Sequence, residues 1–133
     1  MANVVPNAFK GELLSGTHNF ASGGDSFKLA LYTANPYTTS STAYSSGAGN
    51  EVSGSAPGYS TGGSALTSQA VASSTATASV DFANLTFSSA TFSAAFGAIY
   101  NDDKSDKLVV ILDFGGTKTA TNGDFTIAFP DPS

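Results

Sequence analysis

Apolar residues recur at every second position through much of this chain, and that period limits the folds it can adopt. Phe27, Leu29 and Leu31 alternate with lysine, alanine and tyrosine, and residues 125–129 repeat the pattern. Successive side chains of a β-strand point to opposite faces, so a period of two indicates strands. The sequence therefore predicts an all-β protein with antiparallel strands.

Further segments carry strand signals. Residues 68–73 and 75–83 are rich in threonine, serine and valine, which predicts two strands or one long bent strand. Residues 91–100 alternate large and small side chains, which predicts a strand covered on both faces, with four residues on one face: Phe92, Phe96, Ala98 and Tyr100. In the segment 107–114, the run from Leu108 to Leu112 is apolar on both faces, which predicts that this segment is the most buried strand. We expect Gly115 and Gly116 to end it, and Asn122-Gly123 to form a hairpin turn before the last strand.

About six to eight short strands with turns between them favour a two-sheet β-sandwich of jelly-roll type. The 133 residues suit a single domain, spanning residues 1–133, that can bury a core of its own. The chain has no cysteine, so disulfides do not contribute to its stability.

One N-terminal segment has the features of a short helix. Pro6 suits a first helical turn, and Phe9, Leu13 and Leu14 fall on one face at helical spacing. Gly16 stands where a helix would end. A helix of barely three turns is unstable alone, so we expect it to pack on the sheet or on a neighbouring protein.

Residues 37–64 form a long connection that is rich in serine, threonine, glycine, alanine and tyrosine. Tyrosine among serine and glycine is typical of interfaces, because the ring gives contact area at little entropic cost. The sequence thus predicts a protein-binding surface formed by five residues: Tyr37, Tyr44, Tyr59, Phe9 and Leu13. The alternative is a solvated loop whose tyrosines lie over the domain's own core.

The charge pattern excludes some partners and favours others. Only 11% of the residues are charged, with five lysines, no arginine and ten acidic residues, for a net charge of -5. Binding of nucleic acid normally needs a clustered basic face, so no nucleic-acid partner is predicted. No stretch reaches the length of a membrane span, and residues 1–6 lack the basic start and apolar core of a signal peptide. A hydroxyl-rich surface with little charge costs little to desolvate, which suits contact with another protein; β-rich extracellular domains share this composition.

No pattern of residues predicts catalysis, a cofactor or a metal. His18 is the only histidine and is expected to be a surface or packing residue. Residues 101–106 are acidic but lack the glycine and glutamate of a helix-loop-helix calcium site, so we expect a solvated hairpin turn, with a looser cation site as the alternative. No serine has a nucleophile elbow with a base. Five carboxylates outside that turn lie in no glycosidase signature: Glu12, Glu51, Asp81, Asp113 and Asp124.

A series of short motifs in a fixed order gives a resemblance to a known group of proteins. The motifs occupy residues 7–16, 27–33, 50–54, 58–63, 98–102, 113–116 and 122–127. In this order they resemble small structural proteins of tailed bacteriophages, particularly marine phages, over roughly residues 7–129. The resemblance implies a virion component assembled in the host cytoplasm. Its leading role would be a capsid decoration or cement protein that binds the major capsid protein and copies of itself. The alternative is a neck, tail or fibre component that binds a receptor or glycan. The resemblance brings no catalytic residues.

Overall fold

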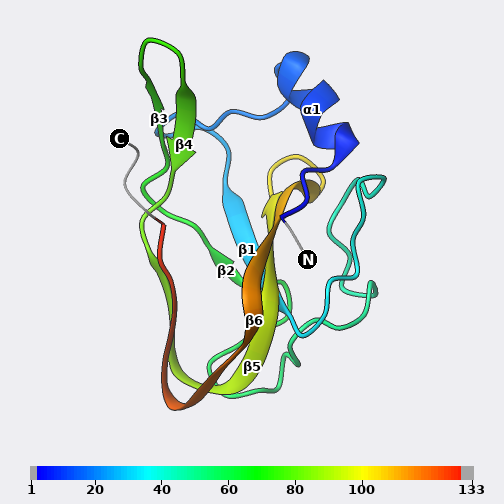
Figure 1. Cartoon of the computed structure of the whole chain (residues 1–133), viewed down its shortest axis with the longest axis vertical. Helices are drawn as coiled ribbons and strands as arrows, with labels where there is room; N and C mark the ends of the chain where they lie inside the picture. The colour runs from blue at the N-terminus through cyan, green and yellow to red at the C-terminus, as the bar shows by residue number, and fades with distance from the viewer. Residues whose placement is uncertain (1–2, 130–133) are drawn as a thin grey trace.

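The computed structural model describes residues 3–129 and shows a mostly β protein with one short helix (Figure 1). This part of the prediction is confirmed. The elements in chain order are α1 (Asn7–Leu14), β1 (Phe27–Tyr32), β2 (Ser64–Ala65), β3 (Ala70–Ser73), β4 (Ala78–Asp81), β5 (Leu85–Asn101) and β6 (Lys107–Ile127).

The described strands form two antiparallel sheets. One has four strands in the order β2-β1-β5-β6, and the other is the two-stranded hairpin of β3 and β4. The hairpin confirms that residues 68–83 hold two strands rather than one bent strand. A closed sandwich or jelly-roll topology is not confirmed, because the sheets do not close on one another.

β5 and β6 are far longer than the sequence suggests, and two predicted breaks in β6 are wrong. Gly115 and Gly116 do not end the strand, and Asn122-Gly123 is not a hairpin turn, because β6 runs through both sites. All of these residues except Gly123 have positive φ angles, and pairing with β5 resumes after each irregularity. Extra residues on one strand of a pair bend it without ending it. The β5–β6 hairpin therefore curves back on itself (Figure 1).

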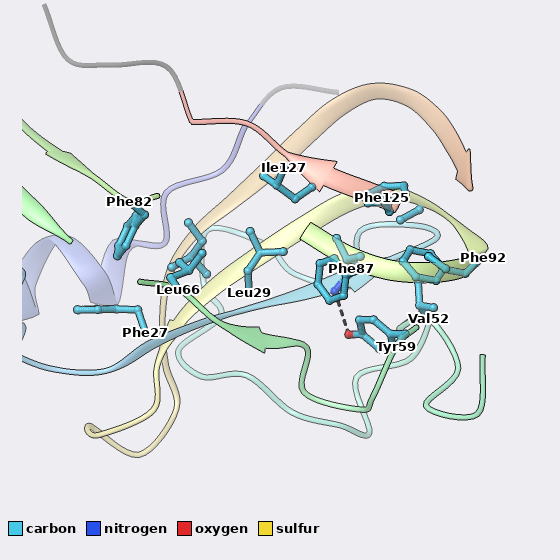
Figure 2. Close-up of a cluster of buried hydrophobic side chains, with 14 of the residues drawn as sticks. Phe27, Leu29, Val52, Tyr59, Leu66, Phe82, Phe87, Phe92, Phe125 and Ile127 are labelled. Atoms are coloured by element: carbon cyan, nitrogen blue, oxygen red, sulfur yellow. Dashed lines mark hydrogen bonds between the residues drawn. The ribbon is translucent and has the colours of Figure 1, made fainter. Parts of the chain in front are cut away.

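The main core lies inside this curve. Phe87, Phe125 and Ile127 come from the far part of the β5–β6 hairpin and join the same buried cluster as Leu29 of β1 (Figure 2). Tyr59, from the long connection, packs against Phe87 at a ring-centroid distance of 5.7 Å. One bent hairpin thus supplies opposite sides of the core.

A second cluster covers the other face of β1 and β5. Tyr32, Tyr100 and Leu108 are buried there, and Tyr37 of the long connection packs with them. Residues 91–100 are covered on both faces, as predicted. Phe92 and Phe96, however, do not share a face: they belong to different clusters, because a register shift between Ala94 and Phe96 turns the later side chains to the opposite face of the sheet.

The most buried strand is β1 and not the predicted segment 107–114. Five of the six residues of β1 are buried, whereas Val110 and residues 112–114 are only half-buried. The reason is topological: β1 lies inside the four-stranded sheet and β6 lies at its edge.

Helix α1 ends as the sequence predicts. The Gly16 amide donates to the Leu13 carbonyl, and the Thr17 amide donates to the Glu12 carbonyl. Gly16 has a φ of 72°, so these bonds form a Schellman motif. No residue of the helix is buried, and the helix lies against β6.

Candidate protein-binding surface

The structure corrects the predicted tyrosine surface. Tyr37 and Tyr59 are buried, with 6% and 5% of their surface exposed, so they are not available for contact with a partner. Tyr44 is half-buried, and its ring stacks on that of Tyr100 at 4.4 Å. The alternative, that these tyrosines lie over the domain's own core, describes all three better. The long connection is therefore a covering layer of the fold.

Glu51 organises this layer. Its carboxylate accepts hydrogen bonds from the Tyr44 hydroxyl at 3.0 Å, the Tyr59 hydroxyl at 2.7 Å and the Gly62 amide at 2.7 Å. The Tyr59 oxygen in turn accepts the Leu31 amide of β1 at 3.0 Å. Hydrogen bonds to a charged carboxylate are strong where the surroundings have a low dielectric constant. Glu51 therefore fastens the long connection to the sheet through Tyr59.

Alkaline pH should unfold the protein through these tyrosines. Burial raises the pKa of Tyr32, Tyr44, Tyr59 and Tyr100 above the usual value of 10. The unfolded chain loses these phenolic protons near pH 10 and the folded chain only at higher pH, so stability falls as pH rises above about 10. A pH titration followed by tyrosinate absorbance and circular dichroism should show ionisation and unfolding together. Four phenols that ionise near pH 10 in a protein that stays folded would contradict the buried network.

The structure instead presents an apolar groove at one end of the molecule. The groove has a volume of about 660 Å³ and lies between α1, the β3–β4 hairpin and β6. Val5, Leu13, Val71 and Val80 line it, and between 39% and 59% of each residue is exposed. None of the described residues that line it is charged. Exposed apolar side chains gathered in one place are typical of a contact surface.

The floor of the groove is made of buried side chains. It includes Phe20, Val109 and His18, whose side chain is fully buried. The Phe9 ring lies 5.1 Å from the His18 ring and 6.1 Å from the Phe20 ring, so the helix and the floor pack as one aromatic cluster. The prediction of Phe9 and Leu13 as contact residues is thus compatible with their position, because both line the groove.

Charged groups beside the groove hold α1 in place. The Glu12 carboxylate lies 2.8 Å from the Lys107 ammonium of β6 and 3.2 Å from His18 Nε2. Burial raises the pKa of Glu12, but hydrogen bonds from Lys107 and His18, together with the positive charge of Lys107, outweigh this and hold the pKa below 4.5. Glu12 therefore ties the helix to the sheet through both partners.

His18 acts as a structural link, as expected of a packing residue. Its Nδ1 lies 2.9 Å from Asn101 Nδ2, which also donates to Asp25 Oδ2 at 2.9 Å. Asn101 Oδ1 accepts the Asp103 amide, which fixes the orientation of the Asn101 side chain. His18 Nδ1 must then accept, and Nε2 carries the proton that is donated to Glu12. These hydrogen bonds run from Glu12 through His18 to Asn101, so they connect α1 to the end of β5, where the turn to β6 begins.

The acidic segment 101–106 forms the hairpin turn that the sequence predicts. Asp103 accepts the Ser26 amide at 2.7 Å, and Asp102 lies 3.4 Å from the Lys28 ammonium. In the described part of the chain, no three His, Asp or Glu side chains gather where they could hold a metal ion.

Sequence reasoning missed the hairpin side of the groove. Val71 and Val80 are the only large apolar residues between Gln69 and Asp81, and they face each other across β3 and β4. Two isolated valines in a segment whose one charged residue is Asp81, at its end, were the available signal.

Comparisons with protein-family models, curated proteins and solved structures find no match to this chain. Among residues 3–129, no helix combines the length and apolarity that crossing a membrane requires.

Proposed function

We propose that this chain is a structural protein of a tailed-phage particle, a capsid decoration or cement protein that binds the major capsid protein. The observation that carries the proposal is the uncharged apolar groove between α1 and the β3–β4 hairpin. Full burial of an exposed valine or leucine side chain contributes roughly 1.5–3 kcal/mol. Val5, Leu13, Val71 and Val80 are about half exposed, so a partner that covers them gains about half of that at each. The placement in a phage particle rests on the order of the sequence motifs, which resembles that of tailed-phage structural proteins.

Two further features support a role as a clamp between shell subunits. Hydrogen bonds among Glu12, His18 and Asn101 already hold the floor of the groove in place. Binding therefore loses little conformational entropy in the groove. Many copies on a lattice bind with high avidity even when each contact is weak. As part of this proposal, the two halves of the curved β5–β6 hairpin, one paired with β1 and the other folded back over the core, serve as the two layers of a β-sandwich of jelly-roll type, which gives the clamp its stiffness.

A second groove favours the neck, tail or fibre alternative. It has a volume of about 580 Å³ and combines the rings of Phe114, Phe125 and Phe129 with the charged groups of Lys118 and Asp124. Aromatic faces with a few polar groups suit a glycan or another small ligand. This role predicts few copies per particle.

Copy number per particle tests the proposal and separates it from the alternative. Quantitative mass spectrometry of purified particles should find hundreds of copies, and labelled antibody should distribute over the whole head. A handful of copies at one vertex would support the neck, tail or fibre role instead. Particles that contain none of the chain would contradict both roles.

A further inference from the structure

The β3–β4 hairpin carries an open strand edge that no described part of the molecule covers. All four residues of β3 are exposed. A two-stranded hairpin is only marginally stable in water, and it usually needs a further strand or a packing partner. Figure 1 shows the hairpin projecting at one end of the molecule.

The outer edge of β3 has free backbone groups in a defined pattern. The Ser74 amide donates to the Thr77 carbonyl at 2.7 Å, which closes the hairpin. Hydrogen-bonded pairs alternate along an antiparallel ladder, so Ala72 bonds to Ser79 and the groups of Val71 and Ser73 point outward. Among residues 3–129, no hydrogen bond reaches these outward groups.

Apart from its length of four residues, the edge has none of the features that normally prevent pairing. Proteins protect edge strands with lysine, proline or bulges. No charged residue lies between Glu51 and Asp81, and β3 contains neither proline nor a bulge. A chain of net charge -5 repels its own copies in general, but here no charge opposes close approach.

We propose that the outer edge of β3 pairs with the same edge of a second copy, about a two-fold axis at Ala72. In this register Val71 of one copy bonds to Ser73 of the other, and Ala72 faces Ala72. Across the joined sheet, Asp81 of one copy is aligned with the hairpin turn of the other copy. The two Asp81 carboxylates are therefore kept apart. The hydrogen-bond pattern is self-complementary, as a two-fold interface requires.

The pairing has a consequence for the groove that rests on the proposed function. Opposite residues of an antiparallel pair point to the same face, so the Val71 and Val80 side chains of both copies lie on one face of the joined sheet. Both grooves then open toward the same side. A dimer could therefore place two contact surfaces on one shell.

Cross-linking tests the register directly, because the chain has no cysteine of its own. Residues in a non-hydrogen-bonded pair have Cα atoms about 4.5 Å apart, which a disulfide can bridge. Ala72→Cys should form a disulfide-linked dimer on mild oxidation, and Thr75→Cys, in the exposed turn of the same hairpin, should not. Equal cross-linking of the two variants, or none with Ala72→Cys, would overturn the proposal.

Sedimentation velocity over a concentration series gives the second test. The contact is short, so dimerisation should be weak and visible at high concentration. Ser73→Pro removes an outward donor from β3 and should raise the dissociation constant about tenfold or more. Ala78→Pro removes the corresponding donor from the outer edge of β4 and should leave it unchanged. Loss of the dimer in Ala78→Pro alone, or a wild-type chain that stays monomeric at every concentration, would contradict pairing through β3. The absence of the protein from phage particles would contradict the proposed function but not the β3 dimer. The two proposals can therefore be refuted independently.

Discussion

Replacing Gly63 with alanine should prevent stable folding. Gly63 has a φ of 77°, and a Cβ atom there would lie 2.7 Å from Ala30 Cα and closer still to the Leu29 carbonyl. These are backbone atoms of β1 at the centre of the sheet, so neither side can move without loss of strand pairing. We expect a loss of more than about 4 kcal/mol, a large part of the total stability of a domain of this size. Urea unfolding followed by circular dichroism measures it.

Gly49→Ala is the matched control. Gly49 has a similar φ of 88°, but a Cβ atom there meets nothing within 4 Å. The substitution should cost only about 1–2 kcal/mol for the left-handed backbone. Similar losses in the two variants would show that the close approach of Gly63 to β1 does not matter for stability.

Removal of the Glu51 carboxylate should loosen the whole long connection. Glu51→Ala leaves the Tyr44 hydroxyl, the Tyr59 hydroxyl and the Gly62 amide without their acceptor. Unsatisfied groups of this kind cost about 1–3 kcal/mol each when buried. Tyr59 is buried and the other two are half-buried, so we expect a total of about 3–5 kcal/mol. Chemical unfolding gives the stability, and hydrogen exchange should show loss of protection at Leu31, whose amide donates to Tyr59.

Two variants calibrate this result. Glu51→Gln keeps one oxygen acceptor and should lose about half as much stability as Glu51→Ala. Asp124→Ala removes an exposed carboxylate elsewhere and should change stability by no more than about 0.5 kcal/mol. If Glu51→Ala behaves like Asp124→Ala, the hydrogen-bond network does not hold the connection.

The period of the apolar residues was enough to predict the class of fold and most strand positions. β1, the β3–β4 hairpin, the 101–106 turn and the end of α1 follow from alternation, turn residues and a glycine cap. The path of β6 does not, because glycine pairs normally end strands. Only the partner strand decides whether Gly115 and Gly116 bend β6 or break it.

The candidate site shows the same limit in a different way. Composition favoured the tyrosines as contact residues. A tyrosine can also find its partners inside its own domain, as Tyr59 does: its ring packs on Phe87 and its hydroxyl donates to Glu51. Val71 and Leu13 are 58 positions apart, so the groove they share depends on the path of the chain between them. Periodicity within a segment does not contain that information.

Binding to phage heads that lack the protein tests the central claim most directly. Leu13 lines the groove, whereas its neighbour Leu14 does not and is 90% exposed, so the pair offers a matched comparison. Wild type and Leu14→Glu should bind the heads saturably in a sedimentation assay, and Leu13→Glu should lose most of that binding because it places a charge in an apolar contact. Circular dichroism should show that both variants remain folded. Equal binding of Leu13→Glu and wild type, or no binding by wild type, would contradict the account.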